Sequence, residues 1–378
     1  MIFHAFTLIV FVCYAILITA ISIGWLRLKV FKGKPNLKNI KVSILVAVRN
    51  ESENIRALIK SLSSQNYPTN LLEVILIDDH STDGTADLIN NQIQDLTNFK
   101  LLSVRDAQLY GKKAAITQGI GASAGELILI TDADCVADIS WVSTMVSFYE
   151  IYSPHLILGP VCMINDGSFF GKFQSLEFSS LISSAAGSCN AGFPLMANGA
   201  NMAFTREAFD TCKGFIGNLK YPSGDDMFLL MNIKQQFGAR SIRFLRSQAA
   251  IVNTPATLGF KEFIQQRLRW VSKSSGYTDP LLIASSLIVF LANVLIVVLA
   301  FLAFLLPGYI LPFVIVYSFK FIFDFPLMFS FNRFQKSGKL LVLFPFSMLD
   351  SRIERFNPSV VSASQCIEMG CSLFCCSF

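Results

Sequence analysis

Asp132 and Asp134 stand one residue apart, at the end of a segment (126–130) that predicts a buried strand. On extended backbone, residues two apart point to the same side, so these carboxylates are expected to converge. Two like charges about 4 Å apart repel by roughly 1 to 4 kcal/mol at effective dielectric constants of about 80 to 20, and a bound cation would relieve that repulsion. Hard oxygen ligands suit Mg²⁺ or Mn²⁺ shared with phosphate. A solvated turn is the simpler alternative.

Acidic residues also follow other predicted strands. Glu51 comes after the first strand, and Asp78 and Asp79 come after the second. Between 42 and 255, short apolar runs alternate with longer mixed segments, which is typical of a parallel α/β sheet. Ligands of such sheets bind beyond the carboxyl ends of the strands. These acids are therefore expected to share one site with the aspartate pair.

Three more charged residues suit the same chemistry. Lys112 carries a compact positive charge that fits a phosphate oxygen, and it precedes a predicted helix. Asp225 and Asp226 begin an apolar helical stretch. The structural alternative for Asp225 is a helix N-cap, which would need no ligand.

A polar and aromatic group follows on an amphipathic segment just before a long apolar run. Gln266, Arg269 and Trp270 lie on this segment. The alternatives are structural: a solvated basic face for Arg267 and Arg269, and an interfacial aromatic belt for Trp270.

The composition indicates that part of the chain lies in lipid. The 378 residues are 53% hydrophobic and only 15% charged, too apolar for an ordinary soluble protein of this length. Residues 1–25 contain no charged side chain, and about 20 apolar residues are enough to cross a bilayer. A second uncharged stretch is interrupted at Pro307, which predicts two spans within 281–330. Lys320 and Asp324 lie four residues apart in the last span and are expected to pair.

Basic residues set the expected orientation. The linker after the first span contains Lys and Arg but no acid, and Arg333 and Lys336 follow the last span. Positive flanks stay inside, so the central region is expected at the cytoplasmic face of an inner membrane. In chain order, the predicted parts are a transmembrane anchor at 1–25, a basic cytoplasmic linker at 26–41, a catalytic domain at 42–254, an amphipathic interface helix at 255–278, two transmembrane helices at 281–330 and a cytoplasmic or irregular tail at 331–378.

Taken together and in this order, the motifs resemble those of the family 2 inverting glycosyltransferases, the membrane-bound group that includes cellulose, hyaluronan and poly-N-acetylglucosamine synthases. The resemblance runs from about residue 42 to 275 and rests on VSILVAVRNE, VILIDDHSTDGT, GKKAAITQG, TDADC, GANMAF, GDD and the QxxRW of Gln266 to Trp270. It implies an α/β fold of the GT-A type, a mixed and mainly parallel sheet with flanking helices. It also implies transfer of a sugar from a nucleotide-sugar, expected to be a UDP-sugar, to a lipid-linked or glycan acceptor.

The resemblance implies roles for single residues. The expected donor-binding residues are Glu51, Asp78, Asp79, Lys112, Asp132 and Arg269. Asp134, with Asp132, would hold Mg²⁺ or Mn²⁺ on the diphosphate. Asp226 matches the catalytic base. Asn201, Gln266 and Trp270 would bind the acceptor.

The chain departs from the family pattern at several places. Ala47 replaces the usual Pro after the first strand, and Asp225 stands where a Glu is commoner, so Asp225 can share the role of base. About three spans are predicted, fewer than in large processive synthases. Alternatives are a processive polysaccharide synthase, a sugar-nucleotidyltransferase and an inactive membrane partner of a synthase. No nucleic-acid partner is expected.

Overall fold

The structure is a computed structural model that describes residues 2–33, 39–104, 111–216, 224–272, 276–337 and 340. These residues divide into two compact units. Lys29–Ile164 and Met196–Pro255 form the sheet unit, and the described residues of Met1–Leu28, Asn165–Leu195 and Ala256–Phe378 form the helical unit. Most of the predicted tail lies outside the described residues.

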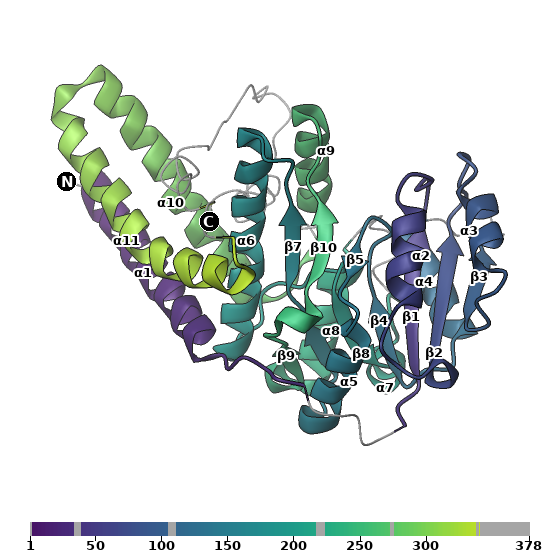
Figure 1. Cartoon of the computed structure of the whole chain (residues 1–378). Helices are drawn as coiled ribbons and strands as arrows, with labels where there is room; N and C mark the ends of the chain where they lie inside the picture. Colours follow the sequence, from purple (N-terminus) through teal and green to yellow (C-terminus); the bar gives the residue numbers. More distant parts are fainter. Residues whose placement is uncertain are drawn as a thin grey trace. The chain divides into compact units, whose positions relative to one another are not determined.

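Among the described residues of the sheet unit, seven strands form one mixed sheet in the order β3-β2-β1-β4-β8-β6-β9 (Figure 1). Neighbouring strands from β3 to β4 are parallel, β8 is antiparallel to β4 and to β6, and β9 is parallel to β6. The strands are β1 (Val42–Val48), β2 (Leu72–Asp78), β3 (Phe99–Ser103), β4 (Leu127–Ile130), β6 (Leu156–Leu158), β8 (Met202–Thr205) and β9 (Ile242–Phe244). The predicted mixed, mainly parallel sheet is confirmed.

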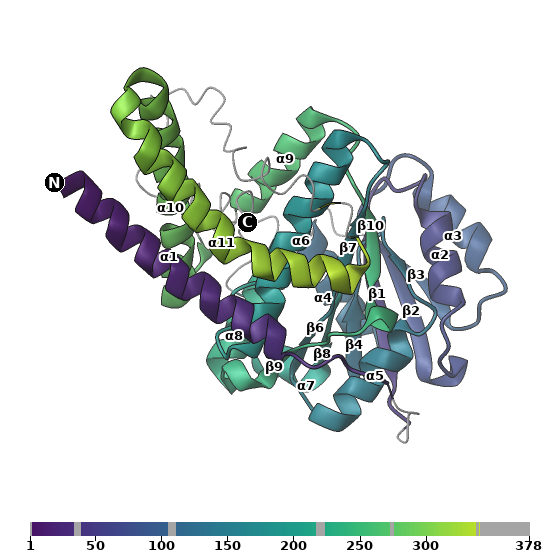
Figure 2. The same cartoon turned by 60° about the vertical axis from the view of Figure 1, so that its left-hand side comes forward.

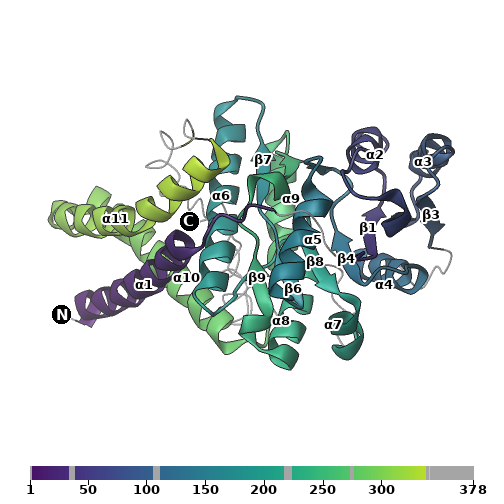
Figure 3. The ribbon, with the colours of Figure 1, turned by 60° about the horizontal axis from the view of Figure 1, so that its bottom comes forward.

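A second sheet has the order β5-β10-β7, with β5 (Val136–Ala137), β10 (Val252–Pro255) and β7 (Val161–Ile164). Helices flank the main sheet. They are α2 (Ile55–Ser63), α3 (Thr85–Ile93), α4 (Lys112–Ala122), α5 (Trp141–Tyr152), α7 (Arg206–Thr211) and α8 (Asp225–Phe237), with short 3₁₀ helices η1 (Thr69–Leu71), η2 (Ala239–Ser241) and η3 (Gln248–Ala250). Helices α2 and α3 lie on one face and α4 on the other (Figure 3). The four residues of β4, which lies between β1 and β8, are fully buried.

The strand order creates a switch point between β1 and β4. The chain steps outward from β1 to β2 and β3, and then returns to place β4 on the other side of β1. Where the connections diverge, the loops separate and leave room for a ligand beyond the strand ends. Glu51 follows one of these strands, and Asp132 and Asp134 follow the other.

The helical unit contains α1 (Ile2–Arg27), α6 (Phe169–Asn190), α9 (Phe260–Val271), α10 (Pro280–Leu305) and α11 (Ile310–Gln335), and η5 (Pro307–Tyr309) joins the last two. Helix α1 packs against α6, α10 and α11, and Figure 2 shows it beside α11. Among the described residues, α1, α10 and the segment Pro307–Gln335 are long and apolar enough to cross a membrane. The break at Pro307 lies where it is predicted.

Helix α1 approaches α6 closely at two glycines. A Cβ atom on Gly24 would lie 2.1 Å from the carbonyl oxygen of Gly187, and one on Gly187 would lie 2.3 Å from the carbonyl oxygen of Ile21. Asn190 Nδ2 donates a hydrogen bond of 2.8 Å to the Gly24 carbonyl. The missing side chains therefore let the two backbones meet, as small residues do in packed apolar helices.

The predicted charge pair in the last span is confirmed. Lys320 Nζ lies 2.5 Å from Asp324 Oδ2, and both residues are almost fully buried. The Tyr14 hydroxyl on α1 donates a hydrogen bond of 2.7 Å to Asp324 Oδ1. A buried carboxylate is stable here because an ammonium and a hydroxyl satisfy it. The pair thus also links α1 to α11.

Candidate active site

The register of the central strands brings their final loops together. Leu45 pairs with Ile130, while Val48 pairs with Asp78, so the chain beyond β4 runs beside the last residues of β1. Each of these parallel strands points its carboxyl end toward the same edge of the sheet. The acids predicted at separate strand ends therefore share one edge.

The loops after β1 and β2 are tied by hydrogen bonds. The Asn50 side-chain oxygen accepts from the Thr82 amide at 2.8 Å, and the Glu51 amide donates to Thr85 Oγ1 at 2.9 Å. Asn50 has a φ of 55°, a left-handed conformation that Asn tolerates better than most residues. These contacts fix the position of Glu51 relative to the loop after β2.

Asp83 is a further residue that holds these loops. One of its carboxylate oxygens accepts from the Ser52 amide at 3.1 Å, and the other accepts from the Thr85 hydroxyl at 2.5 Å and the Thr85 amide at 3.1 Å. The Thr85 hydroxyl is the main cause that lowers the pKa of Asp83, which keeps the carboxylate ionised as an acceptor. The sequence signal for this role is the turn at Asp83-Gly84.

Asp79 connects the loop after β2 to the start of α4. Its Oδ2 atom accepts from the Gly111 amide at 2.9 Å, and its Oδ1 atom lies 3.1 Å from His80 Nδ1. Asp78 ends β2 and accepts from the Ser81 amide at 3.3 Å. Both aspartates are buried. The anchoring of Gly111 places the next residue, Lys112, which is the first of α4, at the same edge.

Lys112 joins acids from two different elements. Its Nζ atom lies 2.6 Å from Asp132 Oδ1 and 3.3 Å from Asp225 Oδ2. Burial would lower the pKa of Lys112, but the carboxylates of Asp132 and Asp225 raise it above its usual value, so the ammonium stays charged. A Cβ atom on Gly199 would lie 3.0 Å from Lys112 Nζ and 3.2 Å from Asp225 Oδ2. A side chain at this position would crowd the ion pair, and Lys112 or Asp225 would have to shift by a few tenths of an ångström.

Asp132, Asp134 and Cys135 form a cluster whose ligand atoms all lie within 4.8 Å of one another. The prediction that the two carboxylates converge along extended backbone is wrong. The strand ends at Ile130, and the chain then turns. The Cys135 amide donates to the Asp132 carbonyl at 3.2 Å across this turn. The turn, and not the period of a strand, brings the two acids together.

The donor set of this cluster suits a hard divalent cation. Burial, followed by the nearby charge of Asp132, raises the pKa of Asp134. Burial also raises the pKa of the Cys135 thiol well above its usual value, so the thiol stays protonated and is a poor ligand. The two carboxylates can therefore supply oxygen ligands to Mg²⁺ or Mn²⁺, and they leave positions for phosphate oxygens.

Glu51 belongs to the same electrostatic environment. Burial raises its pKa, and the charges of Asp134 and Asp132 raise it further. Asn54 Nδ2 opposes this effect by donating to Glu51 Oε2 at 2.7 Å. The loop after β1 and the turn after β4 thus carry acids that repel one another, which favours binding of a cation.

The two acids at the start of α8 differ in their surroundings. Asp225 is buried and forms the ion pair with Lys112, whereas Asp226 is partly exposed. Asp226 Oδ1 accepts from the Met227 amide at 2.7 Å. Gly224 precedes them with a φ of 89°, which begins the helix sharply. Of the two carboxylates, that of Asp226 is the more accessible to a substrate.

Asn201 lies inside the sheet unit and is only 1% exposed. Its side-chain oxygen accepts from Trp141 Nε1 at 2.9 Å, and its Nδ2 atom donates to the carbonyls of Pro160 and Ala250, each at 2.7 Å. The amide is therefore committed to protein partners. The acceptor contact predicted for Asn201 stays a prediction.

The variant Asn201→Ala should destabilise the sheet unit. Removal of the amide leaves one indole N–H and two carbonyls without their partner, and an unsatisfied buried polar group costs about 1 to 3 kcal/mol. We expect the unfolding free energy to fall by about 3 kcal/mol, measured by urea denaturation in detergent. If Asn201→Ala left the unfolding free energy unchanged and raised the KM for the acceptor, Asn201 would instead be an acceptor-binding residue.

The remaining predicted residues lie on α9 in the helical unit. Arg269 is exposed, and Gln266 and Trp270 are partly buried. Arg267 is only 4% exposed, so the alternative that placed it on a solvated basic face is wrong. The roles predicted for Gln266, Arg269 and Trp270 stay predictions.

Residues 43–212 match the sequence profile of the family described as "Glycosyl transferase family 2". The "Probable glycosyltransferase YdaM" of Bacillus subtilis (strain 168) is 30% identical over 151 residues, which cover 39% of this chain and 33% of that protein. The poly-beta-1,6-N-acetyl-D-glucosamine synthase of Staphylococcus epidermidis is 32% identical over 143 residues, 37% of this chain and 33% of that protein. The matches span about a third of the length of these relatives.

A solved structure extends the likeness of fold to almost the whole chain. The mannosyltransferase PcManGT from Pyrobaculum calidifontis, solved with GDP-Man and Mn²⁺, has a TM-score of 0.51 and 16% sequence identity. The alignment covers 98% of this chain and 94% of that one. By the profile match, residues 43–212 form a glycosyl transferase family 2 domain, and the strand order together with this structural likeness shows a fold of the GT-A type.

Proposed function

We propose that the protein transfers a sugar, with inversion, from a nucleotide-sugar to a lipid-linked or glycan acceptor at the cytoplasmic face of the inner membrane. One observation carries the proposal: Lys112 joins Asp132, which like it lies within the family 2 match, to Asp225 of α8, beside a cluster that suits a divalent cation. A phosphate-binding lysine, metal ligands and a candidate base are the parts that transfer from a diphosphate requires.

The donor nucleotide is proposed to bind the loops after β1 and β2. Glu51 and Asp79 lie on these loops, Asp78 ends β2, and the hydrogen bonds of the loops favour a preformed site. A UDP-sugar is the proposed donor. The structurally similar mannosyltransferase was solved with a different nucleotide-sugar, GDP-Man, so the nucleotide base has to be tested directly.

Asp132 and Asp134 are proposed to hold Mg²⁺ or Mn²⁺, because their oxygens are close together and the neighbouring thiol stays protonated. A bound divalent ion would stabilise the negative charge that develops on the departing diphosphate. The related mannosyltransferase was solved with Mn²⁺, which supports a divalent ion. Lys112 would add positive charge at the same leaving group, and donor binding by Arg269 stays a prediction.

Asp226 is the proposed catalytic base. It would accept the proton of the acceptor hydroxyl while that oxygen bonds to the anomeric carbon and the bond from this carbon to the diphosphate breaks. The ion pair with Lys112 occupies Asp225, which supports the choice of its neighbour. Attack on the face opposite the leaving group inverts the anomeric centre without a covalent intermediate.

The acceptor is proposed to be delivered by the membrane. The three long apolar helices among the described residues and the basic linker support a membrane enzyme whose sheet unit faces the cytoplasm. Gln266 and Trp270 are the proposed acceptor contacts, since Trp270 offers a flat apolar face for a pyranose ring.

Processive polysaccharide synthesis is the second candidate. The likeness to a poly-beta-1,6-N-acetyl-D-glucosamine synthase and the QxxRW motif favour it. Product length after incubation with labelled donor separates repeated addition from a single transfer.

The test is a screen of UDP-, GDP- and ADP-sugars with membranes that contain the protein. We expect one donor class to release nucleoside diphosphate and to label a lipid or glycan product, only with Mg²⁺ or Mn²⁺. EDTA should stop both. Release of pyrophosphate would indicate a sugar-nucleotidyltransferase, and no turnover with any donor would support an inactive partner. Either result would overturn the proposal.

A further inference from the structure

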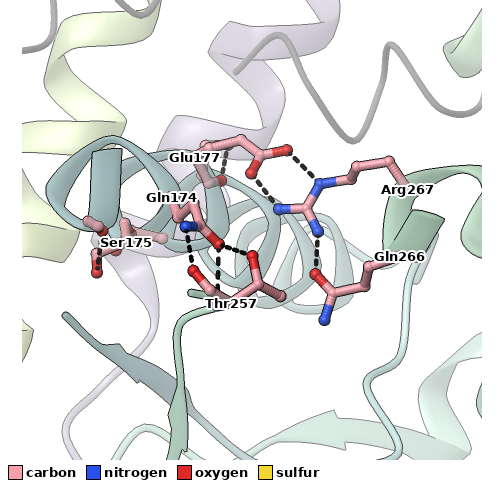
Figure 4. Close-up of polar contacts among 9 residues, drawn as sticks. Gln174, Ser175, Glu177, Thr257, Gln266 and Arg267 are labelled. Carbon is pink, nitrogen blue, oxygen red and sulfur yellow. Dashed lines mark hydrogen bonds and ion pairs between the residues drawn. The ribbon is translucent and has the colours of Figure 1, made fainter. Parts of the chain in front are cut away.

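The helix that carries Gln266, Arg269 and Trp270 is attached to α6 by a buried ion pair. Arg267 Nε donates to Glu177 Oε1 at 2.9 Å, and Arg267 Nη2 donates to Glu177 Oε2 (Figure 4). Arg267 is 4% exposed and Glu177 is 2% exposed. Two parallel bonds between a planar guanidinium and a carboxylate fix the orientation of both groups, which a single charge contact does not.

The same guanidinium contacts two residues of the QxxRW motif. Arg267 Nη1 donates to Gln266 Oε1 at 2.7 Å, and Arg267 Cζ lies 4.2 Å from the centre of the Trp270 ring. It also lies 4.4 Å from the centre of the Phe263 ring, one turn earlier on α9. The position of Glu177 therefore fixes the Arg267 side chain, and Arg267 in turn restrains Gln266 and Trp270.

A second contact holds the chain just before α9. The Gln174 side-chain oxygen accepts from the Thr257 hydroxyl at 2.7 Å and from the Thr257 amide at 3.2 Å, while Gln174 Nε2 donates to the Thr257 carbonyl at 2.9 Å (Figure 4). Gln174 lies three residues before Glu177, so both side chains project from neighbouring turns of α6. Attachment at two points restricts rotation of α9 about its own axis.

Stability alone does not explain this arrangement. A buried ion pair is often no more stabilising than well-packed apolar residues of similar size, but it specifies one geometry. Glu177 is too deeply buried to contact a substrate directly. What the pair determines is the direction in which the motif side chains leave α9.

We propose that Glu177 is a positioning residue for sugar transfer: it holds Arg267, which in turn orients Gln266 and Trp270. The proposal rests on the proposed function for its catalytic consequence. Its structural part, the orientation of Trp270, can be measured without any turnover.

Tryptophan fluorescence tests the structural part. Trp25 and Trp141 are fully buried, and Trp270 is the partly exposed member of the three tryptophans in the chain. Quenching by acrylamide therefore reports mainly on Trp270. In Glu177→Gln, we expect stronger quenching than in the wild type. The double variant Glu177→Gln/Arg267→Gln also removes the contacts of Arg267 with Gln266 and Trp270, so its quenching should be at least as strong.

Kinetics test the catalytic part. Glu177→Gln should slow labelling of product and release of nucleoside diphosphate by roughly 10- to 100-fold, because small misplacement of a positioning group has effects of that size. The KM for the donor should change less than kcat, since the loops after β1 and β2, where the nucleotide is proposed to bind, belong to the sheet unit. Glu177→Asp keeps the charge and should restore part of the rate.

Ser179→Ala is the matched control on the same helix. Ser179 is also buried, but it donates to Gln335 Oε1 at 2.9 Å and not to α9. We expect wild-type quenching and rate. If Glu177→Gln does not fold, Arg267→Lys tests the same proposal by quenching and by rate. Lys keeps the charge but lacks the planar fork, so we expect stronger quenching and a slower rate than in the wild type.

The outcomes separate the two proposals. Wild-type quenching and rate in Glu177→Gln, or equal losses in Ser179→Ala, would overturn the positioning role. If no nucleotide-sugar supports turnover in the wild type, the proposed function fails. Stronger quenching in Glu177→Gln would then still support the structural part.

Discussion

Asp226→Asn should abolish measurable sugar transfer while donor affinity stays close to the wild-type value. Asparagine has nearly the same shape as aspartate but cannot accept the proton of an acceptor hydroxyl, and loss of a general base lowers rates by roughly 10²- to 10⁴-fold. The effect is expected on kcat, because a base acts in the chemical step. Release of nucleoside diphosphate measures the rate, and titration calorimetry with the unreacted nucleotide measures binding.

Asp225→Asn is the matched control, since it makes the same change one residue earlier. This variant loses the carboxylate that lies 3.3 Å from Lys112 Nζ, so we expect weaker donor binding and a smaller fall in kcat. The hydrogen bond from the Met227 amide to Asp226 does not involve the altered side chain. Full turnover by Asp226→Asn would remove Asp226 from the role of base. A larger kcat loss in Asp225→Asn would transfer that role to Asp225.

The central sheet and the gathering of acids were predictable because they depend on local patterns. Buried parallel strands give continuous apolar runs, and the acids that end them must meet at one edge of the sheet. The close approach of Asp132 and Asp134 was also expected, although through the wrong conformation. A turn and an extended strand bring two acids at this spacing together about equally well, so the spacing alone cannot distinguish them.

The contacts that determine positions within the site were not predictable from one sequence. Glu177 and Arg267 are separated by 90 residues, and nothing near Arg267 in the chain indicates a buried acidic partner. Its place on an amphipathic segment instead favoured a solvated face. Asn201 lies in a motif that resembles a family signature, yet its partners come from three other segments. Such roles depend on contacts between residues far apart in the chain, and the local periodicity of the sequence does not reveal these contacts.

Asp134→Ala should lose divalent-ion dependence and activity together. If Asp132 and Asp134 share a Mg²⁺ or Mn²⁺ ion, removal of one carboxylate weakens its binding and with it the stabilisation of the departing diphosphate. That stabilisation amounts to several kcal/mol, which corresponds to a rate loss of about 10³-fold. The measurements are release of nucleoside diphosphate across a Mn²⁺ titration and, independently, binding of Mn²⁺ by electron paramagnetic resonance in the presence of nucleotide.

The exposed Asp138 provides a control for the loss of an acid in the same segment. Asp138→Ala should keep wild-type activity and Mn²⁺ binding. Activity of the wild-type protein in EDTA, or normal Mn²⁺ binding by Asp134→Ala, would contradict a metal role for Asp134.

Replacement of Asp134 should lower activity but should not lower the stability of the metal-free protein. Burial, with the charge of Asp132, raises the folded-state pKa of Asp134, so the ionised carboxylate is unfavourable in the folded protein without metal. This penalty is present above the folded-state pKa and disappears as the pH falls below the unfolded-state value. At neutral pH and without metal, Asp134→Asn should therefore unfold at the wild-type temperature or above it. A lower unfolding temperature of Asp134→Asn would show that the Asp134 carboxylate stabilises the metal-free fold. It would contradict the view that Asp132 and Asp134 repel each other until a metal ion binds.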